Sequence, residues 1–203
     1  MNILLVDDHK LFAKSLSVAL EDYSEIEQFY IAQNITDLEK ILCEKNIDII
    51  LLDINLGSLS DADGLAVASN LRHLHPSVKL MILTGYDLPV YRREARKIGV
   101  NGFLNKSISP DDLIASLMHV YHGNTCFPPE KNELIIEDLT AMEKTILQQL
   151  GTGKKRKTIA AELYISERTL SNHLQHIYEK LGVSSSVEAV TKALQLGYIP
   201  PLC

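Results

Sequence analysis

The sequence has few cysteines and no long apolar run, and each absence excludes a class of protein. Cys43, Cys126 and Cys203 are odd in number, far apart in the 203 residues, and without metal-ligand spacing. They predict reduced thiols rather than a disulfide framework or a zinc site. No apolar run approaches the length that crosses a membrane, and the first residues follow a strand pattern rather than that of a signal peptide. We therefore expect a cytoplasmic protein with no membrane partner.

Charge is divided unevenly along the chain, although the formal net charge is only −6. Residues 1–137 carry a net charge of −8, whereas residues 138–203 carry a net charge of +2. An acidic first part and a mildly basic second part indicate different partners. Between them the apolar pattern is interrupted by glycine, asparagine, two prolines and several charges, as is typical of a linker. We predict one domain over 1–122, a linker over 123–137 and a second domain over 138–203.

Short, nearly continuous aliphatic runs predict buried parallel strands in the first part. The clearest run is Ile47–Asp53, in which aliphatic residues lead directly into a carboxylate. Similar runs cover Asn2–Val6 and Val78–Thr84, and shorter candidates cover Ile26–Ile31 and Gly102–Leu104. Segments with helical apolar spacing separate them, so that strand and helix alternate five times. This order predicts an α/β fold with a doubly wound, five-stranded parallel sheet.

Polar side chains follow four of these strands. Asp7 and Asp8 follow the first strand, Asp53 and Thr84 lie at the ends of the third and fourth, and Lys106 follows the fifth. The carboxyl ends of parallel strands line one crevice, where such folds bind ligands. Alone, a strand-end carboxylate could equally cap the next segment, so the prediction depends on the whole group.

Three carboxylates at one edge of a sheet repel one another unless a cation is bound. Because the expected ligands are oxygens, Mg²⁺ or Mn²⁺ is the expected ion. A carboxylate beside such an ion is suited to accept a phosphoryl group. Lys106 could neutralise phosphoryl oxygens and Thr84 could donate a hydrogen bond to another.

These residues carry a resemblance to a known family. The first part resembles the receiver domain of two-component response regulators, through Val6–His9, Leu52–Asn55, Leu83–Gly85 and Phe103–Lys106. The resemblance covers about 120 residues and consists of ordered motifs at the strand ends.

The resemblance implies roles for individual residues. Asp53 would be the phosphoacceptor, and Asp7 and Asp8 would hold the metal together with the backbone carbonyl of Asn55. Phe103 would be the aromatic residue that swings inward with Thr84 on phosphorylation, although an apolar residue on a core strand also fits plain packing.

The loop after Asp53 departs from the family pattern. Leu56-Gly57 stands where Met-Pro or Leu-Pro is usual, and Asp63-Gly64 lies about three positions late because of the inserted region around Ser58–Ser60. These departures leave the acceptor intact, but the resemblance does not extend to the geometry of this loop or to the rate of dephosphorylation.

The second part shows only helical periodicity, over roughly Thr140–Leu150, Arg156–Leu163, Glu167–Leu181 and Ser185–Leu196. The middle two helices have the spacing of a helix-turn-helix, with Ser166 as the cap of the second. The exposed side of that helix carries amides and hydroxyls, which suit base edges in a major groove but also fit a solvated helix face. The basic run Lys154-Lys155-Arg156-Lys157 favours DNA, because it can follow a phosphate backbone.

The second part resembles the DNA-binding domain of the NarL/FixJ (LuxR-type) regulators. By that resemblance Ser171, Asn172 and Gln175 read bases, and the last helix, Val187 to Leu196, forms a dimer face. Lys157, Thr169 and His173 would approach phosphates, with Lys154 and Lys155 nearby. The matching residues are Leu139-Thr140, Glu143, Gly153, Lys157, Ile159-Ala160, Leu163, Ile165-Ser166, Thr169, His173-Leu174, Ile177, Lys180–Val183 and Glu188-Ala189.

Together the two parts predict a transcriptional response regulator rather than an enzyme. A sensor histidine kinase would phosphorylate Asp53, and phosphorylation would control homodimer formation and binding to double-stranded promoter DNA. One alternative is a DNA-binding regulator that works without phosphate. The other is a Mg²⁺-dependent phosphohydrolase with Asp53 as nucleophile, which would need a general acid and a substrate cap that the sequence does not suggest.

Overall fold

The computed structural model describes residues 1–57, 63–129 and 137–199. These residues form two compact units. The first contains a parallel sheet with its helices and ends at Pro129, and the second contains four helices. The predicted insertion around Ser58–Ser60 lies outside the described residues, as do residues 130–136 of the predicted linker.

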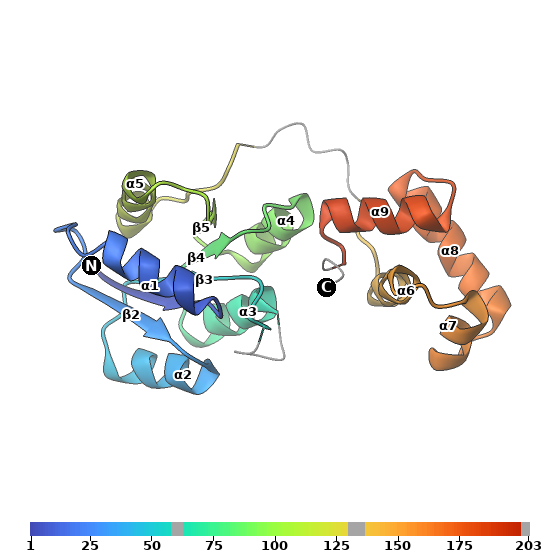
Figure 1. Cartoon of the computed structure of the whole chain (residues 1–203), viewed down its shortest axis with the longest axis horizontal. Helices are drawn as coiled ribbons and strands as arrows, with labels where there is room; N and C mark the ends of the chain where they lie inside the picture. Colours follow the sequence, from blue (N-terminus) through green and yellow to red (C-terminus); the bar gives the residue numbers. More distant parts are fainter. Residues whose placement is uncertain (58–62, 130–136, 200–203) are drawn as a thin grey trace. The chain divides into compact units, whose positions relative to one another are not determined.

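The first unit is built on five parallel strands in the order β2-β1-β3-β4-β5 (Figure 1). The aliphatic runs form the three central strands, and every residue of β3 is buried. The expectation of a doubly wound five-stranded parallel sheet is confirmed. The strands are β1 (Asn2–Val6), β2 (Gln28–Ala32), β3 (Ile49–Leu52), β4 (Lys79–Thr84) and β5 (Gly102–Asn105).

One strand lies slightly later than the sequence predicts. Pairing with β1 begins at Gln28, opposite Asn2, whereas the expected strand began at Ile26. The backbone N–H of Ile26 donates instead to the carbonyl of Tyr23 in a turn. The alternation of apolar residues therefore begins at Ile26, two residues before the hydrogen-bonded pairing of β2 with β1 begins at Gln28.

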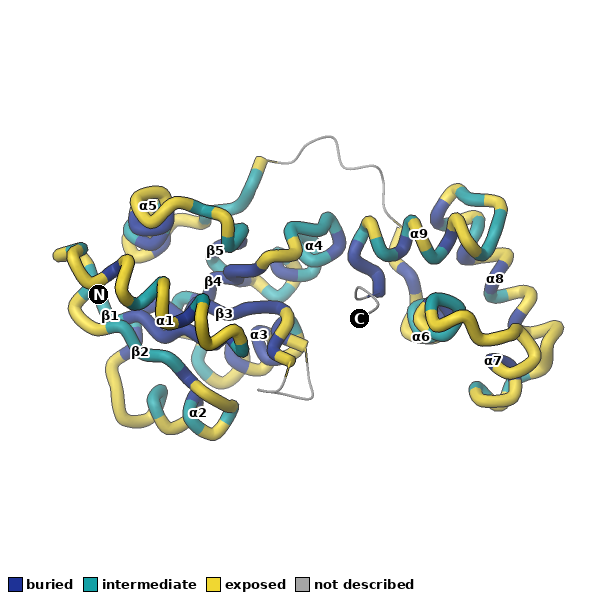
Figure 2. The backbone as a smooth tube through the Cα atoms, in the orientation of Figure 1, coloured by how far each residue is buried: buried dark blue, intermediate teal, exposed yellow. Residues whose placement is uncertain are grey.

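Helices cover both faces of the sheet. Alternate strand residues, such as Leu5 and Leu51, pack with α1 and α5 on one face. Their neighbours, such as Leu4 and Ile50, pack with α2, α3 and α4 on the other. Figure 2 shows the strands as the buried layer between these helices. The helices are α1 (Lys10–Ala19), α2 (Ile35–Glu44), α3 (Gly64–Leu74), α4 (Pro89–Ile98) and α5 (Pro110–Tyr121).

The register of the sheet brings the strand ends together. Val6 pairs with Leu52, so the residues after β1 and after β3 emerge side by side. The backbone N–H of Asp53 donates to the carbonyl of Val6. At the other side of β3, the pairing of Thr84 with Asn105 sets Lys106 one residue beyond the same edge.

The second unit consists of α6 (Ala141–Gly151), α7 (Arg156–Glu162), α8 (Glu167–Leu181) and α9 (Ser186–Leu196). Side-chain caps fix three of the helix starts: Ser166, the predicted cap, and also Thr140 and Ser185 each accept a hydrogen bond from a backbone N–H in the first turn. The turn between α7 and α8 contains Tyr164, which has a positive φ of 56° and is 96% exposed. The four predicted helices are present, and each bound lies within one residue of the prediction.

Candidate functional site

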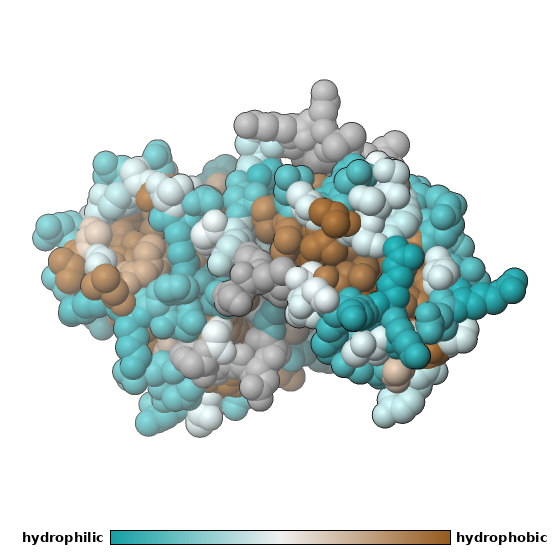
Figure 3. Space-filling view, turned by 45° about the vertical axis from the view of Figure 1, so that its right-hand side comes forward, coloured by the Kyte–Doolittle hydropathy of each residue, from teal (hydrophilic) through white to brown (hydrophobic). Residues whose placement is uncertain are grey.

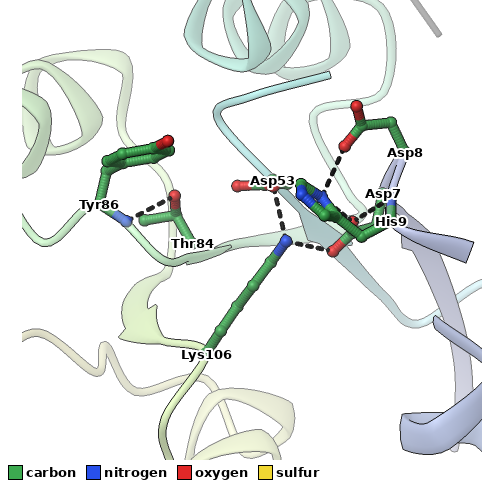
Figure 4. A network of polar contacts seen from close by, with 7 residues as sticks. All are labelled: Asp7, Asp8, His9, Asp53, Thr84, Tyr86 and Lys106. Carbon is green, nitrogen blue, oxygen red and sulfur yellow. Dashed lines mark hydrogen bonds and ion pairs between the residues drawn. The ribbon is translucent and has the colours of Figure 1, made fainter. Parts of the chain in front are cut away.

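Three carboxylates and one imidazole meet at the carboxyl edge of the sheet (Figure 4). Asp7, Asp8 and His9 follow β1 and Asp53 follows β3, and each offers a ligand atom within 4.8 Å of the others. Asp7 and Asp53 are buried at 3% and 2% exposure. The expected convergence of these acids is therefore present in the folded chain.

Lys106 reaches into this cluster from the end of β5. Its Nζ lies 2.7 Å from Asp53 Oδ2 and 2.7 Å from Asp7 Oδ2. Figure 4 shows the ammonium group between the two carboxylates. A single cation therefore offsets part of the repulsion among the acids.

Burial and pairing oppose each other in the pKa values of this cluster. Burial raises the pKa of Asp7, because it disfavours the carboxylate, even though Lys106 and the backbone N–H of His9 lower it. Burial would lower the pKa of Lys106, but hydrogen bonds to Asp53 and Asp7 leave it raised. The site therefore holds Lys106 as an ammonium while Asp7 remains costly to ionise.

The donor set fits a small divalent cation. Asp53 Oδ1 is buried without a hydrogen-bond partner among the residues that the structure describes, and such an orphaned acceptor is expensive unless a cation or donor approaches it. The surrounding ligand atoms are mainly carboxylate oxygens, which suit Mg²⁺ and Mn²⁺ better than zinc. Asn55 follows this group and is exposed.

Thr84 and Phe103 lie on adjacent strands beside the acids. Both are completely buried, and Thr84 Oγ1 accepts a hydrogen bond from the backbone N–H of Tyr86 at 3.2 Å. The register pairs Phe103 with Ile82, two residues before Thr84. The Phe103 ring therefore occupies the inward position in this structure.

Two contacts at the site lie outside the sequence prediction. His9 Nδ1 lies 2.7 Å from Asp8 Oδ1. No role was predicted for His9 from the sequence, although it belongs to the Val6–His9 motif and its position directly after two acids could have indicated this contact. Gly57 has a positive φ of 44°, and a Cβ there would lie 2.0 Å from Asp8 Oδ2. Glycine tolerates this positive φ and leaves room for the Asp8 carboxylate, which gives a structural reason for glycine where the family usually has proline.

The second unit presents a polar face along α8. Leu170, Leu174, Ile177 and Leu181 are buried, whereas Ser171, Asn172 and Gln175 are exposed, as expected for side chains on the opposite face. The Ser171 hydroxyl donates to the carbonyl of Glu167 and the Gln175 amide donates to Glu179. To bind a partner outside the chain, both side chains would have to give up these local hydrogen bonds.

The other candidates for DNA contact differ in exposure, and two of them, Lys154 and Thr169, already contact another side chain of this unit. Lys154, Lys155 and Lys157 are exposed on and before α7, and Lys154 pairs with Glu162 at 2.6 Å. His173 is half-buried, and the Thr169 hydroxyl bonds with that of Ser166. Figure 3 shows long hydrophilic side chains projecting from the second unit.

An ion pair between the half-buried Lys180 and the buried Glu143 links α8 to the start of α6. Lys180 Nζ lies 2.8 Å from Glu143 Oε2, and Glu143 also closes a capping box with Thr140. Hydrogen bonds from Lys180 and Thr140 lower the pKa of Glu143 despite its burial. The orientation of α8 thus depends on residues 37 positions apart.

The geometry defines a class of protein, in which a five-stranded parallel sheet with an acidic site at its carboxyl edge is followed by a helix-turn-helix unit. Two family models match the chain, the response regulator receiver domain over residues 3–118 and the bacterial regulatory proteins of the luxR family over residues 137–193. The chain therefore belongs to the response regulators with a LuxR-type DNA-binding domain, a family of transcriptional regulators.

Full-length relatives share this arrangement. The transcriptional regulatory protein YdfI of Bacillus subtilis is 30% identical, with 97% of both chains covered. LnrK of the same organism is 29% identical over 97% of this chain and 98% of the relative. The RcsB–DNA complex has the same fold, with a TM-score of 0.68 at 22% identity over 97% of this chain and 98% of that chain. No described helix is both long and apolar enough to cross a membrane.

Proposed function

We propose that this regulator is switched by phosphorylation of Asp53 and then binds promoter DNA as a homodimer in the cytoplasm. The observation that carries the proposal is the pair of 2.7 Å contacts from Lys106 to Asp53 and Asp7, beside the orphaned Asp53 Oδ1. A regulatory role, rather than turnover of a substrate, agrees with the family. The domain limits 1–122, 123–137 and 138–203 remain part of this proposal.

The chemistry assigned to Asp53 is phosphoryl transfer from a phosphohistidine of a sensor kinase. A carboxylate oxygen of Asp53 forms the new bond to phosphorus, the P–N bond breaks, and the histidine leaves with the electron pair. Lys106 stays close to the transferred group and offsets its charge, and the Thr84 hydroxyl can donate to a phosphoryl oxygen. Phe103 completes the switch by holding its inward position once Thr84 has moved toward the phosphate.

Mg²⁺ or Mn²⁺, held by Asp7, Asp8, Asp53 and the Asn55 carbonyl, would neutralise phosphoryl oxygens when bound. The raised pKa of Asp7 supports this assignment, because a carboxylate that resists ionisation in the folded chain gains most from a neighbouring cation. Asp8 already offers a carboxylate oxygen within 4.8 Å of the ligand atoms of Asp7 and Asp53.

The roles in DNA binding follow the faces of α7 and α8. We assign base reading to Ser171, Asn172 and Gln175, which are exposed on α8. Phosphate contact is assigned to the lysines Lys154, Lys155 and Lys157 together with Thr169 and His173. RcsB of Salmonella, a neighbour in fold, is described as bound to a promoter in the presence of a phosphomimetic, and we propose DNA binding by the phosphorylated form of this chain as well.

The experiment is phosphorylation by acetyl phosphate, followed by intact-mass measurement. We expect one phosphoryl group on the wild-type chain, only when Mg²⁺ or Mn²⁺ is present. Asp53→Ala should abolish the modified species and Asp8→Ala should reduce it sharply. The matched control is Asp22→Ala, an exposed acid outside the site, which should label normally. Equal labelling of Asp53→Ala and wild type would overturn the assignment.

Phosphorylation should also raise the dimer fraction or the affinity for DNA by roughly 5- to 150-fold, the usual range for coupling between two sites. Two half-sites of a palindrome need two chains for tight binding. Sedimentation and gel-shift titrations with and without acetyl phosphate measure the gain. No change in either quantity would favour the regulator that works without phosphate.

A further inference from the structure

The chain does not leave the sheet directly after α5. Residues Asn124–Pro128 turn back and lie along the free edge of β5, where Cys126 forms a parallel bridge with Gly102. The backbone N–H of Cys126 donates to the Asn101 carbonyl at 2.9 Å, and the N–H of Phe103 donates to the Cys126 carbonyl at 2.8 Å. We call residues 124–128 the edge segment. It begins within the stretch that the sequence predicts as linker.

The side chains of the edge segment alternate between the two faces of the sheet, as in a strand. Cys126 packs into the core on the face covered by α1 and α5. Phe127 packs into the core on the opposite face, which also contains Phe103. The approach is close, because a Cβ on Gly102 would lie only 3.0 Å from the Cys126 carbonyl oxygen.

The edge segment also contacts α4. The guanidinium of Arg96 lies 4.7 Å from the centre of the Phe127 ring, in the range of a cation–π contact. An Arg96 nitrogen donates to the Pro128 carbonyl at 3.4 Å. The segment is therefore bonded to the backbone of Phe103 on one side and to α4 on the other, within four residues of the last described residue of the first unit.

We propose that the edge segment relays the phosphorylation state of Asp53 to the second unit. The inference rests on the proposed function, since it concerns how that switch is transmitted. Phe103 is fully buried in this structure and its N–H is bonded to Cys126. Phosphorylation that favours the inward position of Phe103 therefore also favours the docked edge segment. Docking and undocking of residues 124–128 are the two states through which this relay would act.

The first test measures hydrogen exchange on the full-length protein with and without acetyl phosphate and Mg²⁺. We expect phosphorylation to slow exchange of the Phe103 and Cys126 amides by at least ~3-fold, because their hydrogen bonds belong to the favoured state. The control peptide is β2, on the opposite edge of the sheet, and its exchange should not change. Unchanged or faster exchange at Phe103 and Cys126 in phosphorylated protein would overturn the relay.

The second test separates the relay from the phosphorylation itself. Phe127→Ala should accept phosphate at the wild-type level, yet the phosphate-dependent gain in dimer fraction or DNA affinity should fall roughly 2- to 30-fold. The DNA probe is a duplex selected from a random pool with phosphorylated wild-type protein. The matched control is Thr125→Ala, because Thr125 is exposed in the same segment, and it should keep the full gain.

The two tests distinguish failure of the relay from failure of Asp53 phosphorylation. If wild-type protein takes no phosphate on Asp53, the proposed function fails. If wild type and Phe127→Ala both accept phosphate and show equal gains, only the relay fails. Where Phe127→Ala does not fold, the exchange measurement on wild-type protein still decides the matter.

Discussion

Replacing Lys106 with methionine gives a direct test of how the acidic site is held together. Lys106 is only 15% exposed and its ammonium lies 2.7 Å from one oxygen each of Asp7 and Asp53. Methionine keeps most of the apolar stem and removes the ammonium group, which also lies 4.8 Å from the centre of the Phe12 ring. The substitution therefore leaves two buried carboxylates without their shared partner.

Removing one partner of a buried ion pair costs about 3–5 kcal/mol, mostly because the remaining charge stays buried and unpaired. For a unit of this size that loss lowers the unfolding midpoint by about 10–20 °C. The exposed pair Lys154–Glu162 has a similar contact distance of 2.6 Å, with side chains 39% and 41% exposed. Lys154→Met is the matched control and should cost no more than about 1 kcal/mol.

The assay is chemical unfolding of each variant at pH 7, with EDTA or with Mg²⁺. In EDTA, Lys106→Met should lose several kcal/mol and Lys154→Met almost nothing. Mg²⁺ should restore most of the loss in Lys106→Met, since it binds the folded acids without competition from an ammonium, and ligand at 100 times its Kd stabilises by about 2.7 kcal/mol. Equal stability of the two variants in EDTA, or no rescue by Mg²⁺, would refute the electrostatic account of the site.

Three further predictions concern the second unit. Gln175→Ala should weaken binding to the selected duplex by roughly 1–3 kcal/mol and leave binding to random DNA almost unchanged, as measured by titration on both duplexes. Lys157→Ala should weaken both alike and lower the slope of log K against log salt by about one; a larger loss on the selected duplex would contradict a pure phosphate contact. Glu143→Gln, which removes the charge facing Lys180, should cost about 1–3 kcal/mol in unfolding experiments at pH 7, against at most about 1 kcal/mol for the exposed Glu162→Gln. Because the pKa of Glu143 is lowered on folding, its contribution is present above its ordinary pKa and is lost as pH falls through the lowered, folded-state pKa. The stabilities of wild type and Glu143→Gln should therefore converge in acid.

Local sequence patterns carry much of the fold. The run from Ile49 to Leu52 has to be buried on both faces, and only a central parallel strand provides that. Caps such as Ser109, Ser166 and Ser185 mark helix starts, because their side chains accept first-turn N–H groups. These signals act over a few residues, so the sequence alone allows strands, helices and their order to be predicted.

The membership of the acidic site also follows from the sequence. Once the strands are known to be parallel, Asp7, Asp53, Thr84 and Lys106 must emerge at one edge. The distances do not follow, because they depend on register, twist and rotamer. That Lys106 bridges Asp7 and Asp53, and that His9 turns toward Asp8, was decided by tertiary packing.

The edge segment and the Glu143–Lys180 ion pair show what the sequence by itself cannot determine. Residues 124–128 have the glycine-flanked, proline-containing composition of a linker, yet an unpaired edge of β5 offers their backbone two hydrogen bonds. Glu143 and Lys180 are 37 residues apart and meet only because α6 and α8 pack together. The sequence determined the helices, the strands and the residues at their ends. The tertiary structure decided the contacts between distant segments. Those contacts form where backbone groups and charges that local structure leaves unpaired meet partners from elsewhere in the fold.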